Sequence, residues 1–234
     1  MKEDFNPIFV AMDGMAGERI MELRNELAGH VGGFKLNDAL DNDPSIIKSF
    51  SEFGLVFADP KLLDIEKTVR NRARVISARK PGFITVHASG GIPMMKAALE
   101  GVEGTDTKIL AVTVLTNLND EQCVGIYGDE RDAIVTKFAG WASEAGVHGI
   151  VCSAHELEML SEYDHLKDLI KVVPGIRPKW FQDASDDQKM VMTPAEAIKL
   201  GANYLVIGRP ITDAKNPVKA ADDTFEEIQT ARLA

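Results

Sequence analysis

The stretch LVFADPKLLDIEKTVRNRARVISARK, residues 55–80, contains the unit from which the fold can be deduced. It begins with the apolar run LVFA, which is typical of a buried strand. From residue 65 onward, apolar side chains recur at the three- and four-residue spacing of an amphipathic helix. The stretch is therefore predicted to form one strand followed by one helix.

The same order of strand and helix repeats along the chain. Strands are expected at residues 8–13, 33–37, 55–61, 83–89, 108–116, 149–154, 170–175 and 204–209. Helices are expected at residues 19–31, 46–54, 65–80, 93–102, 133–146, 156–163 and 193–202, with a last helix that runs through residues 225–233. Nearly continuous apolar strands are typical of parallel strands covered by helices. Eight such units predict a (βα)8 TIM barrel; the alternative, a doubly wound open sheet, lacks a GxGxxG after its first strand.

The overall composition predicts one ordinary globular domain over residues 1–234. The chain has 45% hydrophobic and 26% charged residues, and its start, MKEDFNPIFV, has neither the order of a signal peptide nor that of a transit peptide. It contains no run of the roughly 20 apolar residues that cross a bilayer. Two cysteines without metal-like spacing suit the reducing cytoplasm. The net charge of −10 argues against generic binding to nucleic acid or to an anionic membrane.

Polar residues gather at the C-terminal ends of the predicted strands, which form the active face of such a barrel. These residues are Asp13, Lys35, Asp59, Lys61, His87, Thr116 and Arg209. Asp59 and Lys61 are two positions apart, so strand alternation predicts that their side chains point to the same side. Alone, this pair could be a salt bridge that closes a strand end. The number of polar strand ends favours an active site.

Two loops near the end of the chain have the composition of a phosphate site. Residues 174–177 read PGIR and residues 208–210 read GRP, after the seventh and eighth predicted strands. Glycine allows close approach of a backbone N–H, and arginine offers forked donors to an anion. Either loop alone could be a turn with a surface arginine, whereas the two together favour a phosphorylated ligand. The long segment of residues 177–192 is predicted to be a functional lid or a disordered loop.

The start of the helix at residues 193–202 is marked by a capping box. Thr193, Pro194 and Glu196 form this signal, and Gly201 stands where the helix should stop.

The motif DPKLLDI at residues 59–65 matches the pattern D-x-K-x-x-D-I, and other motifs follow in the same order as in a known family. They are VAMD, FKLN, VHASGG, LAVTVLT, VCSAHE, VVPGIRP and DQKMVMTPAEAIKLGANYLVIGRPIT. With them the chain resembles the orotidine 5′-phosphate decarboxylase family in its bacterial form, from the first strand nearly to the last helix. One departure is Asn37, which stands where a glycine often follows the lysine of the second strand.

The resemblance implies a metal-free and cofactor-free conversion of orotidine 5′-monophosphate into uridine 5′-monophosphate. Lys61 would be the general acid that protonates C6, Asp59 would lie near the departing carboxylate, and Lys35 would pair with Asp59 and touch the ribose. Asp64 and Thr68 would reach into the neighbouring subunit's site, which implies a homodimer. The remaining substrate contacts implied by the resemblance are Asp13 with a ribose hydroxyl, Thr116 with the pyrimidine, and Arg177, Gln188, Gly208 and Arg209 with the phosphate.

The residues themselves add two expectations. Carboxylates on both sides of Lys61 favour its charged form, as a proton donor at a developing carbanion requires. His87 is expected to be a hydrogen-bonded histidine rather than a base. The resemblance further implies that the loop of residues 177–188 closes as a lid over the phosphate.

Two other functions compete with this one. A Mg²⁺-dependent 3-keto-gulonate-phosphate decarboxylase or hexulose-phosphate synthase would need a metal-ligating glutamate at the end of the second strand. This chain has Lys35 there, and a charged lysine cannot ligate Mg²⁺. A non-catalytic nucleotide-binding barrel would have no need for the cluster around Lys61.

Overall fold

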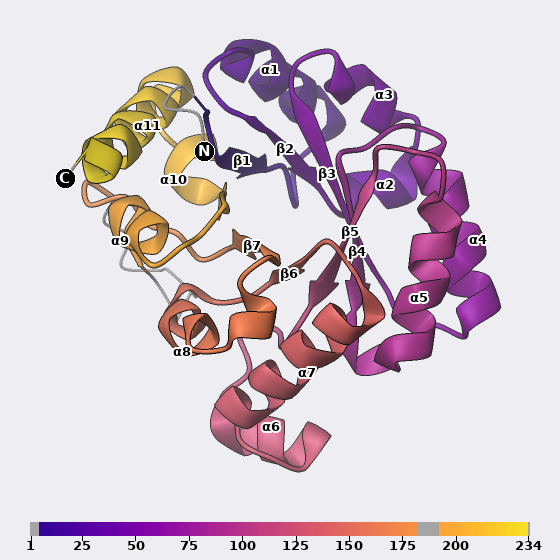
Figure 1. Cartoon of the computed structure of the whole chain (residues 1–234). Coiled ribbons are helices and arrows are strands. Elements are labelled where there is room, and N and C mark those ends of the chain that lie inside the picture. The colour runs from indigo at the N-terminus through magenta and orange to yellow at the C-terminus, as the bar shows by residue number, and fades with distance from the viewer. Residues whose placement is uncertain (1–4, 182–191, 234) are drawn as a thin grey trace.

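The computed structural model describes residues 5–181 and 192–233. Within these residues, eight parallel strands pair in sequence order and close into a barrel (Figure 1). The strands are β1 (Ile8–Ala11), β2 (Gly33–Leu36), β3 (Leu55–Leu62), β4 (Phe83–His87), β5 (Lys108–Val112), β6 (Gly149–Val151), β7 (Ile170–Val173) and β8 (Tyr204–Ile207). The predicted (βα)8 barrel is confirmed, and the open-sheet alternative is wrong because β1 pairs with β8.

Helices surround this barrel on its outside (Figure 1). They are α1 (Gly17–Leu27), α2 (Ala39–Asn42), α3 (Ile46–Ser51), α4 (Glu66–Ser77), α5 (Gly91–Val102), α6 (Asp120–Tyr127), α7 (Arg131–Ala145), α8 (Leu157–Ser161), α9 (Pro194–Lys199), α10 (Arg209–Thr212) and α11 (Pro217–Leu233). Short 3₁₀ turns lie at Ala88–Gly90, Ala154–Glu156 and Asp164–Leu166. None of the helices in the described part of the chain is long and apolar enough to cross a membrane.

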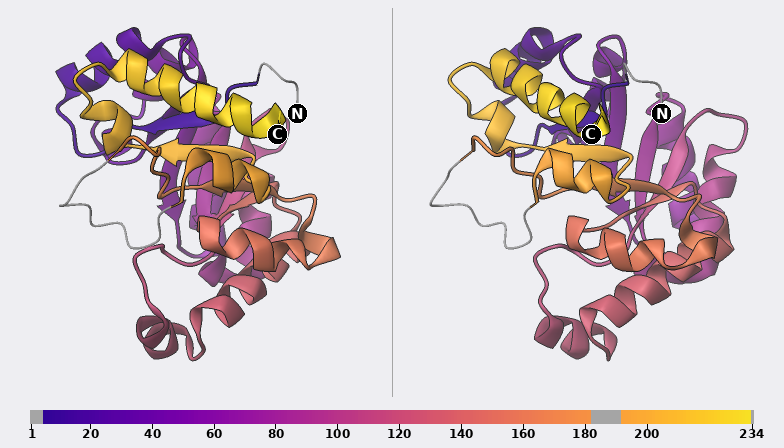
Figure 2. Two further views of the ribbon diagram at one scale, coloured as in Figure 1. Left: turned by 90° about the vertical axis from the view of Figure 1, so that its left-hand side faces the viewer. Right: turned by 60° about the vertical axis from the view of Figure 1, so that its left-hand side comes forward.

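Some helices differ from the sequence prediction. The first ends at Leu27 rather than at residue 31, and Gly29 follows it with a φ of 82°. Three short helices, α2, α6 and α10, were not predicted. Figures 1 and 2 show α6 as an outlying helix beside α7. Its start carries a capping box between Asn119 and Gln122, a signal that the sequence contains.

The capping box predicted for α9 is confirmed. The Thr193 side chain accepts a hydrogen bond from the Glu196 backbone N–H, and the Glu196 carboxylate accepts one from the Thr193 N–H. Pro194 is the first helical residue, and Gly201 has a φ of 97° just after the helix ends. This local chemistry fixes where the chain returns toward β8.

Aromatic side chains fill the lower part of the barrel interior. Phe9, Phe57 and Phe83 pack edge to face with centroids 5.7 to 6.1 Å apart, and Tyr204 joins them. They belong to a buried cluster separate from the larger core between strands and helices. Since side chains alternate along a strand, the next interior positions on these strands lie one layer higher. The apolar layer is therefore the base on which a polar layer is built.

Candidate active site

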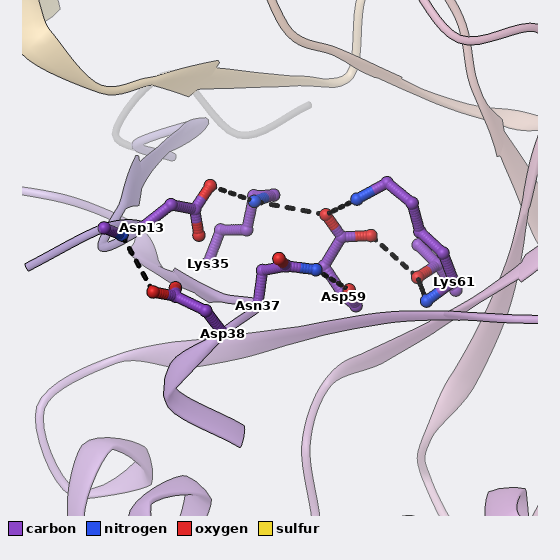
Figure 3. A network of polar contacts seen from close by, with 8 residues as sticks. Asp13, Lys35, Asn37, Asp38, Asp59 and Lys61 are labelled. Atoms are coloured by element: carbon purple, nitrogen blue, oxygen red, sulfur yellow. Dashed lines mark hydrogen bonds and ion pairs between the residues drawn. The ribbon is translucent and has the colours of Figure 1, made fainter. Parts of the chain in front are cut away.

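Four charged side chains of alternating sign form the polar layer at the top of the barrel (Figure 3). Lys35 Nζ lies 2.5 Å from Asp13 Oδ2 and 3.1 Å from Asp59 Oδ2. Lys61 Nζ lies 2.6 Å from the same Asp59 oxygen. The predicted proximity of Asp59 to Lys61 and the predicted pairing of Lys35 with Asp59 are confirmed, whereas the contact of Asp13 with Lys35 was not predicted. The chain of contacts places two ammonium groups on one carboxylate oxygen.

The side chains of the network differ in how far they are exposed to solvent. The Asp59 side chain is only 4% exposed, whereas that of Lys61 is 32% exposed. Burial alone would lower the pKa of Lys35, but the attraction of Asp59 and Asp13 outweighs it, so the pKa is raised. Lys35 therefore stays charged between its two carboxylates, and Lys61 is the cation at the open end.

The backbone of β3 is irregular where it carries Asp59 and Lys61. Ala58 pairs with Ile84 and Leu62 with Val86, so three residues of β3 lie opposite one residue of β4. Lys61 has a φ of 45°, in the left-handed region, which costs a non-glycine residue about 1–2 kcal/mol. The simple alternation by which Asp59 and Lys61 were predicted to share a side is thus wrong for this segment. They meet because the bulge turns the lysine back toward the carboxylate.

Two uncharged residues that were not predicted to belong to the site support the network. The hydroxyl of Thr85, on β4, contacts both the Asp59 carboxylate and the Lys61 backbone. Asn37 Nδ2 donates to the Asp59 backbone carbonyl at 2.6 Å. The sequence did contain a signal for Thr85, because it lies two residues after the interior residue Phe83.

Asp13 follows β1 and is held by a turn. The carboxylate of Asp38 accepts a hydrogen bond from the Gly14 backbone N–H at 3.0 Å (Figure 3). Gly14 has a φ of 71°, which glycine adopts without strain. This turn presents the Asp13 carboxylate to Lys35.

A cavity of about 580 Å³ lies beside the network. Its size suits a nucleotide-sized or drug-sized ligand. Six predicted site residues line it: Asp13, Lys35, Thr116, Arg177, Gly208 and Arg209. Asp59 and Lys61 are not among its lining residues, and Lys35 connects them to it.

The two predicted phosphate loops lie on the same cavity. Arg177 follows β7, and its guanidinium carbon lies 5.5 Å from the centroid of the Phe181 ring. Gly208 precedes α10, and Arg209 is the first residue of that helix. Because β7 and β8 are adjacent, both arginines lie on one wall of the cavity. They come from the end of the chain, whereas the lysines of the network come from β2 and β3, near its start. Gln188, the other predicted phosphate contact, lies outside the described residues.

The loop after β5, which carries Thr116, is held by a buried ion pair. Arg131 Nη1 donates to the backbone carbonyls of Leu115 and Leu118 at 3.0 and 2.9 Å. Arg131 Nε donates to the Glu156 carboxylate at 2.8 Å. Burial raises the pKa of Glu156, against the opposing charge of Arg131. Sequence reasoning did not find this pair, because its partners are far apart in the chain.

Asp64 and Thr68 follow the end of β3. Asp64 is exposed between two exposed apolar side chains, Leu63 and Ile65, and its carboxylate accepts a hydrogen bond from the Ile65 N–H. Between the described residues Asp64 and Lys61 there is no ion pair within one chain. Thr68 is half-buried in the first turn of α4.

His87 ends β4 and is half-buried. Burial lowers its pKa, and the charge of Lys61 lowers it further, while Asp59 acts in the opposite direction. His87 is therefore mainly neutral near pH 7. Among the described residues, no group of three or more histidine, cysteine or acidic side chains is arranged to hold a metal ion.

The family model described as "Orotidine 5'-phosphate decarboxylase / HUMPS family" matches residues 6–224. An orotidine 5′-phosphate decarboxylase of Syntrophomonas wolfei subsp. wolfei is 39% identical over 235 residues, which cover 95% of this chain and 97% of that protein. One from Streptococcus thermophilus is 43% identical over 183 residues, covering 77% and 78%. The crystal structure of orotidine 5′-phosphate decarboxylase from Lactobacillus acidophilus has a TM-score of 0.81 to this chain at 30% identity, covering 95% and 99%. The chain is thus similar to these proteins over most of its length.

Proposed function

Because the chain belongs to the orotidine 5′-phosphate decarboxylase / HUMPS family, we propose that it converts orotidine 5′-monophosphate into uridine 5′-monophosphate and carbon dioxide. It is a carboxy-lyase of pyrimidine nucleotide synthesis. The observation that carries the proposal is the Asp13–Lys35–Asp59–Lys61 network beside the cavity. We propose that neither a metal ion nor an organic cofactor takes part.

Lys61 is the proposed proton donor to C6 of the pyrimidine. Loss of carbon dioxide leaves an electron pair in the plane of the ring, where ring resonance cannot stabilise it. An ammonium held at that carbon stabilises the developing negative charge and then transfers its proton. Lys61 is the more exposed of the two network lysines, which gives its Nζ access to a bound ligand.

Asp59, Lys35 and Asp13 have supporting roles in this proposal. Asp59 fixes the Lys61 ammonium at 2.6 Å and lies near the departing carboxylate. Lys35, charged between two carboxylates, contacts the ribose, and Asp13 binds a ribose hydroxyl. The partial exposure of Asp13 on the cavity wall supports this last role.

The phosphate group is proposed to bind between the loops after β7 and β8. Arg177 and Arg209 supply forked donors, and Gly208 supplies a backbone N–H. Thr116, on the same cavity, contacts the pyrimidine. Gln188 and the closing of residues 177–188 complete the proposal. Binding energy from the remote phosphate can then be used to raise the rate of the chemical step.

The active form is proposed to be a cytoplasmic homodimer in which Asp64 and Thr68 complete the partner's site. Asp64 makes no ion pair with Lys61 of its own described chain, and the apolar side chains beside it, Leu63 and Ile65, are 55% and 71% exposed. Exposed apolar groups around a functional carboxylate are the arrangement expected of a subunit contact.

The family model also includes HUMPS proteins, so the Mg²⁺-dependent sugar-phosphate reactions are the second candidate. The position at which those relatives need a glutamate is Lys35, whose raised pKa keeps it charged. An ammonium has no lone pair to offer Mg²⁺. This residue favours the decarboxylation of a nucleotide over a metal-assisted reaction.

The experiment that tests the function is an ultraviolet assay with orotidine 5′-monophosphate in excess EDTA. We expect a steady loss of the substrate absorbance with release of carbon dioxide. No loss of absorbance, with a folded protein that binds uridine 5′-monophosphate, would contradict the proposal. Turnover of a sugar phosphate on addition of Mg²⁺ would then support the second candidate.

A further inference from the structure

The position of the Lys61 side chain depends on a strained piece of backbone. Lys61 combines a positive φ with a bulge in the pairing of β3 and β4. Such a conformation persists only where surrounding contacts determine it. Its own strand pairing does not hold the residue in place, because no regular register covers the three residues between Ala58 and Leu62.

Thr85 supplies the missing contact from β4. It is fully buried, and its Oγ1 lies 2.9 Å from the Lys61 backbone N and 2.7 Å from Asp59 Oδ1. The Lys61 N–H can only donate, so the hydroxyl oxygen accepts this bond. The hydroxyl proton is then directed at the carboxylate, which can only accept while ionised. One side chain thus joins the backbone of the proton donor to the carboxylate that orients its ammonium.

Both oxygens of the Asp59 carboxylate are engaged once this bond forms. Oδ1 accepts from Thr85, and Oδ2 accepts from Lys61 and lies 3.1 Å from Lys35 Nζ. On the opposite side, Asn37, the residue that follows β2, donates to the Asp59 backbone carbonyl. The plane of the carboxylate, and with it the position of the Lys61 ammonium, is therefore set from both neighbouring strands.

We propose that Thr85 is a positioning residue for the decarboxylation, acting through the Lys61 backbone and the Asp59 carboxylate without touching the substrate. The inference rests on the proposed function, since it needs Lys61 as the proton donor. Thr85 is fully buried, so it is out of reach of a bound ligand, and its removal should affect the chemical step more than ligand binding.

The test compares Thr85→Val, which keeps the shape and removes the hydroxyl, with Thr85→Ser, which keeps the hydroxyl. Thr107→Val is the matched control. Like Thr85, Thr107 is a buried threonine whose hydroxyl donates a hydrogen bond, in its case to the Pro81 backbone carbonyl, and it lies just before β5. For Thr85→Val we expect kcat to fall by roughly 10- to 100-fold, the loss typical of a small misplacement of a reacting group. KM and the dissociation constant of uridine 5′-monophosphate should change by less than about threefold, and Thr85→Ser should recover most of kcat.

Two results would overturn the inference. One is a Thr85→Val enzyme with the same kcat as Thr107→Val. The other is a folded Thr85→Ser enzyme whose kcat is as low as that of Thr85→Val. If Thr85→Val does not fold, Thr85→Ala takes its place in both comparisons. Absence of turnover in the wild-type protein would instead contradict the proposed function, so the two failures are distinguishable.

Discussion

The protonation of single side chains in this barrel depends on the balance between burial and neighbouring charges. Lys35, between Asp13 and Asp59, has a raised pKa, whereas His87, close to Lys61, has a lowered one. The two shifts have opposite signs because burial, helped by the charge of Lys61, lowers the pKa of His87, whereas two carboxylates outweigh the effect of burial on Lys35. The site thus keeps its lysine charged and its histidine neutral at the same pH.

The lowered pKa of His87 makes a prediction for acid stability. The unfolded chain binds a proton at this residue near pH 6.5, but the folded chain does so only at lower pH, so stability falls as the pH drops below 6.5. His87→Asn removes this contribution. In urea unfolding at about pH 7.5 and about pH 5.5, the variant should lose less free energy of unfolding than the wild type. An equal loss in both proteins would show that His87 titrates alike in the folded and unfolded states.

At this scale, the sequence predicted which residue types gather but not how they touch. Asp59 and Lys61 were placed together by strand alternation, and the structure shows a bulge with a left-handed lysine instead. Thr85 and Asn37 were not predicted as supports, because a hydroxyl or amide becomes informative only when its partners are known. Strand alternation could have placed Thr85 in the barrel interior, but it does not show which groups its hydroxyl contacts.

Elements were predicted best where they are long and regular. All eight strands, and at least part of one helix after each of them, follow from apolar periodicity, although α6 was not predicted and α11 begins at Pro217 rather than at residue 225. The four-residue helices α2 and α10 are too short for any helical period to show. The buried pair of Arg131 and Glu156, which holds the loop after β5, could not be foreseen because it joins two separate β–α units.

Close packing of β2 makes a second prediction. A Cβ added to Gly33 would lie 2.2 Å from the Leu55 carbonyl oxygen and 2.6 Å from the Phe9 ring. Gly33→Ala should therefore reduce the free energy of unfolding by about 1–3 kcal/mol and displace the strand that carries Lys35. Urea unfolding and the decarboxylation rate would measure both effects.

The matched control is Gly140→Ala in α7. A Cβ there would meet only His165 Nε2, at 4.0 Å. Alanine is the better helix former, so this change should stabilise by about 0.5–1 kcal/mol. If Gly33→Ala were as stable as Gly140→Ala, β2 would not be as tightly packed against β3 and Phe9 as described.

At the scale of the whole molecule, the order of polar strand ends is what identifies the face of the barrel that carries the site. The barrel closure pairs β1 with β8, so Asp13 and Lys35 of the charged network line the same cavity as the predicted phosphate loops. The sequence predicted this convergence through the fold. It could not show the assembly of two chains, and the homodimer remains a prediction.

Mixing two inactive variants tests that homodimer. Lys61→Ala and Asp64→Asn should each have very low activity alone, because every active site in either homodimer lacks one of the two functional side chains. A mixed dimer has one site with both residues intact, so random reassociation should restore about a quarter of the wild-type activity. Steady-state turnover after co-refolding measures it. Activity no greater than the average of the two separate variants would contradict a site shared between subunits.

The rate at which Lys61→Ala decarboxylates orotidine 5′-monophosphate, measured beside the wild type in excess EDTA, tests the role of Lys61 most directly. We expect kcat to fall by at least about a thousandfold, because the variant lacks both the charge and the proton that the carbanion needs. Binding of uridine 5′-monophosphate by the variant should remain measurable, which shows that the site is folded. A Lys61→Ala protein that turns over substrate at a rate close to the wild type would contradict Lys61 as the proton donor.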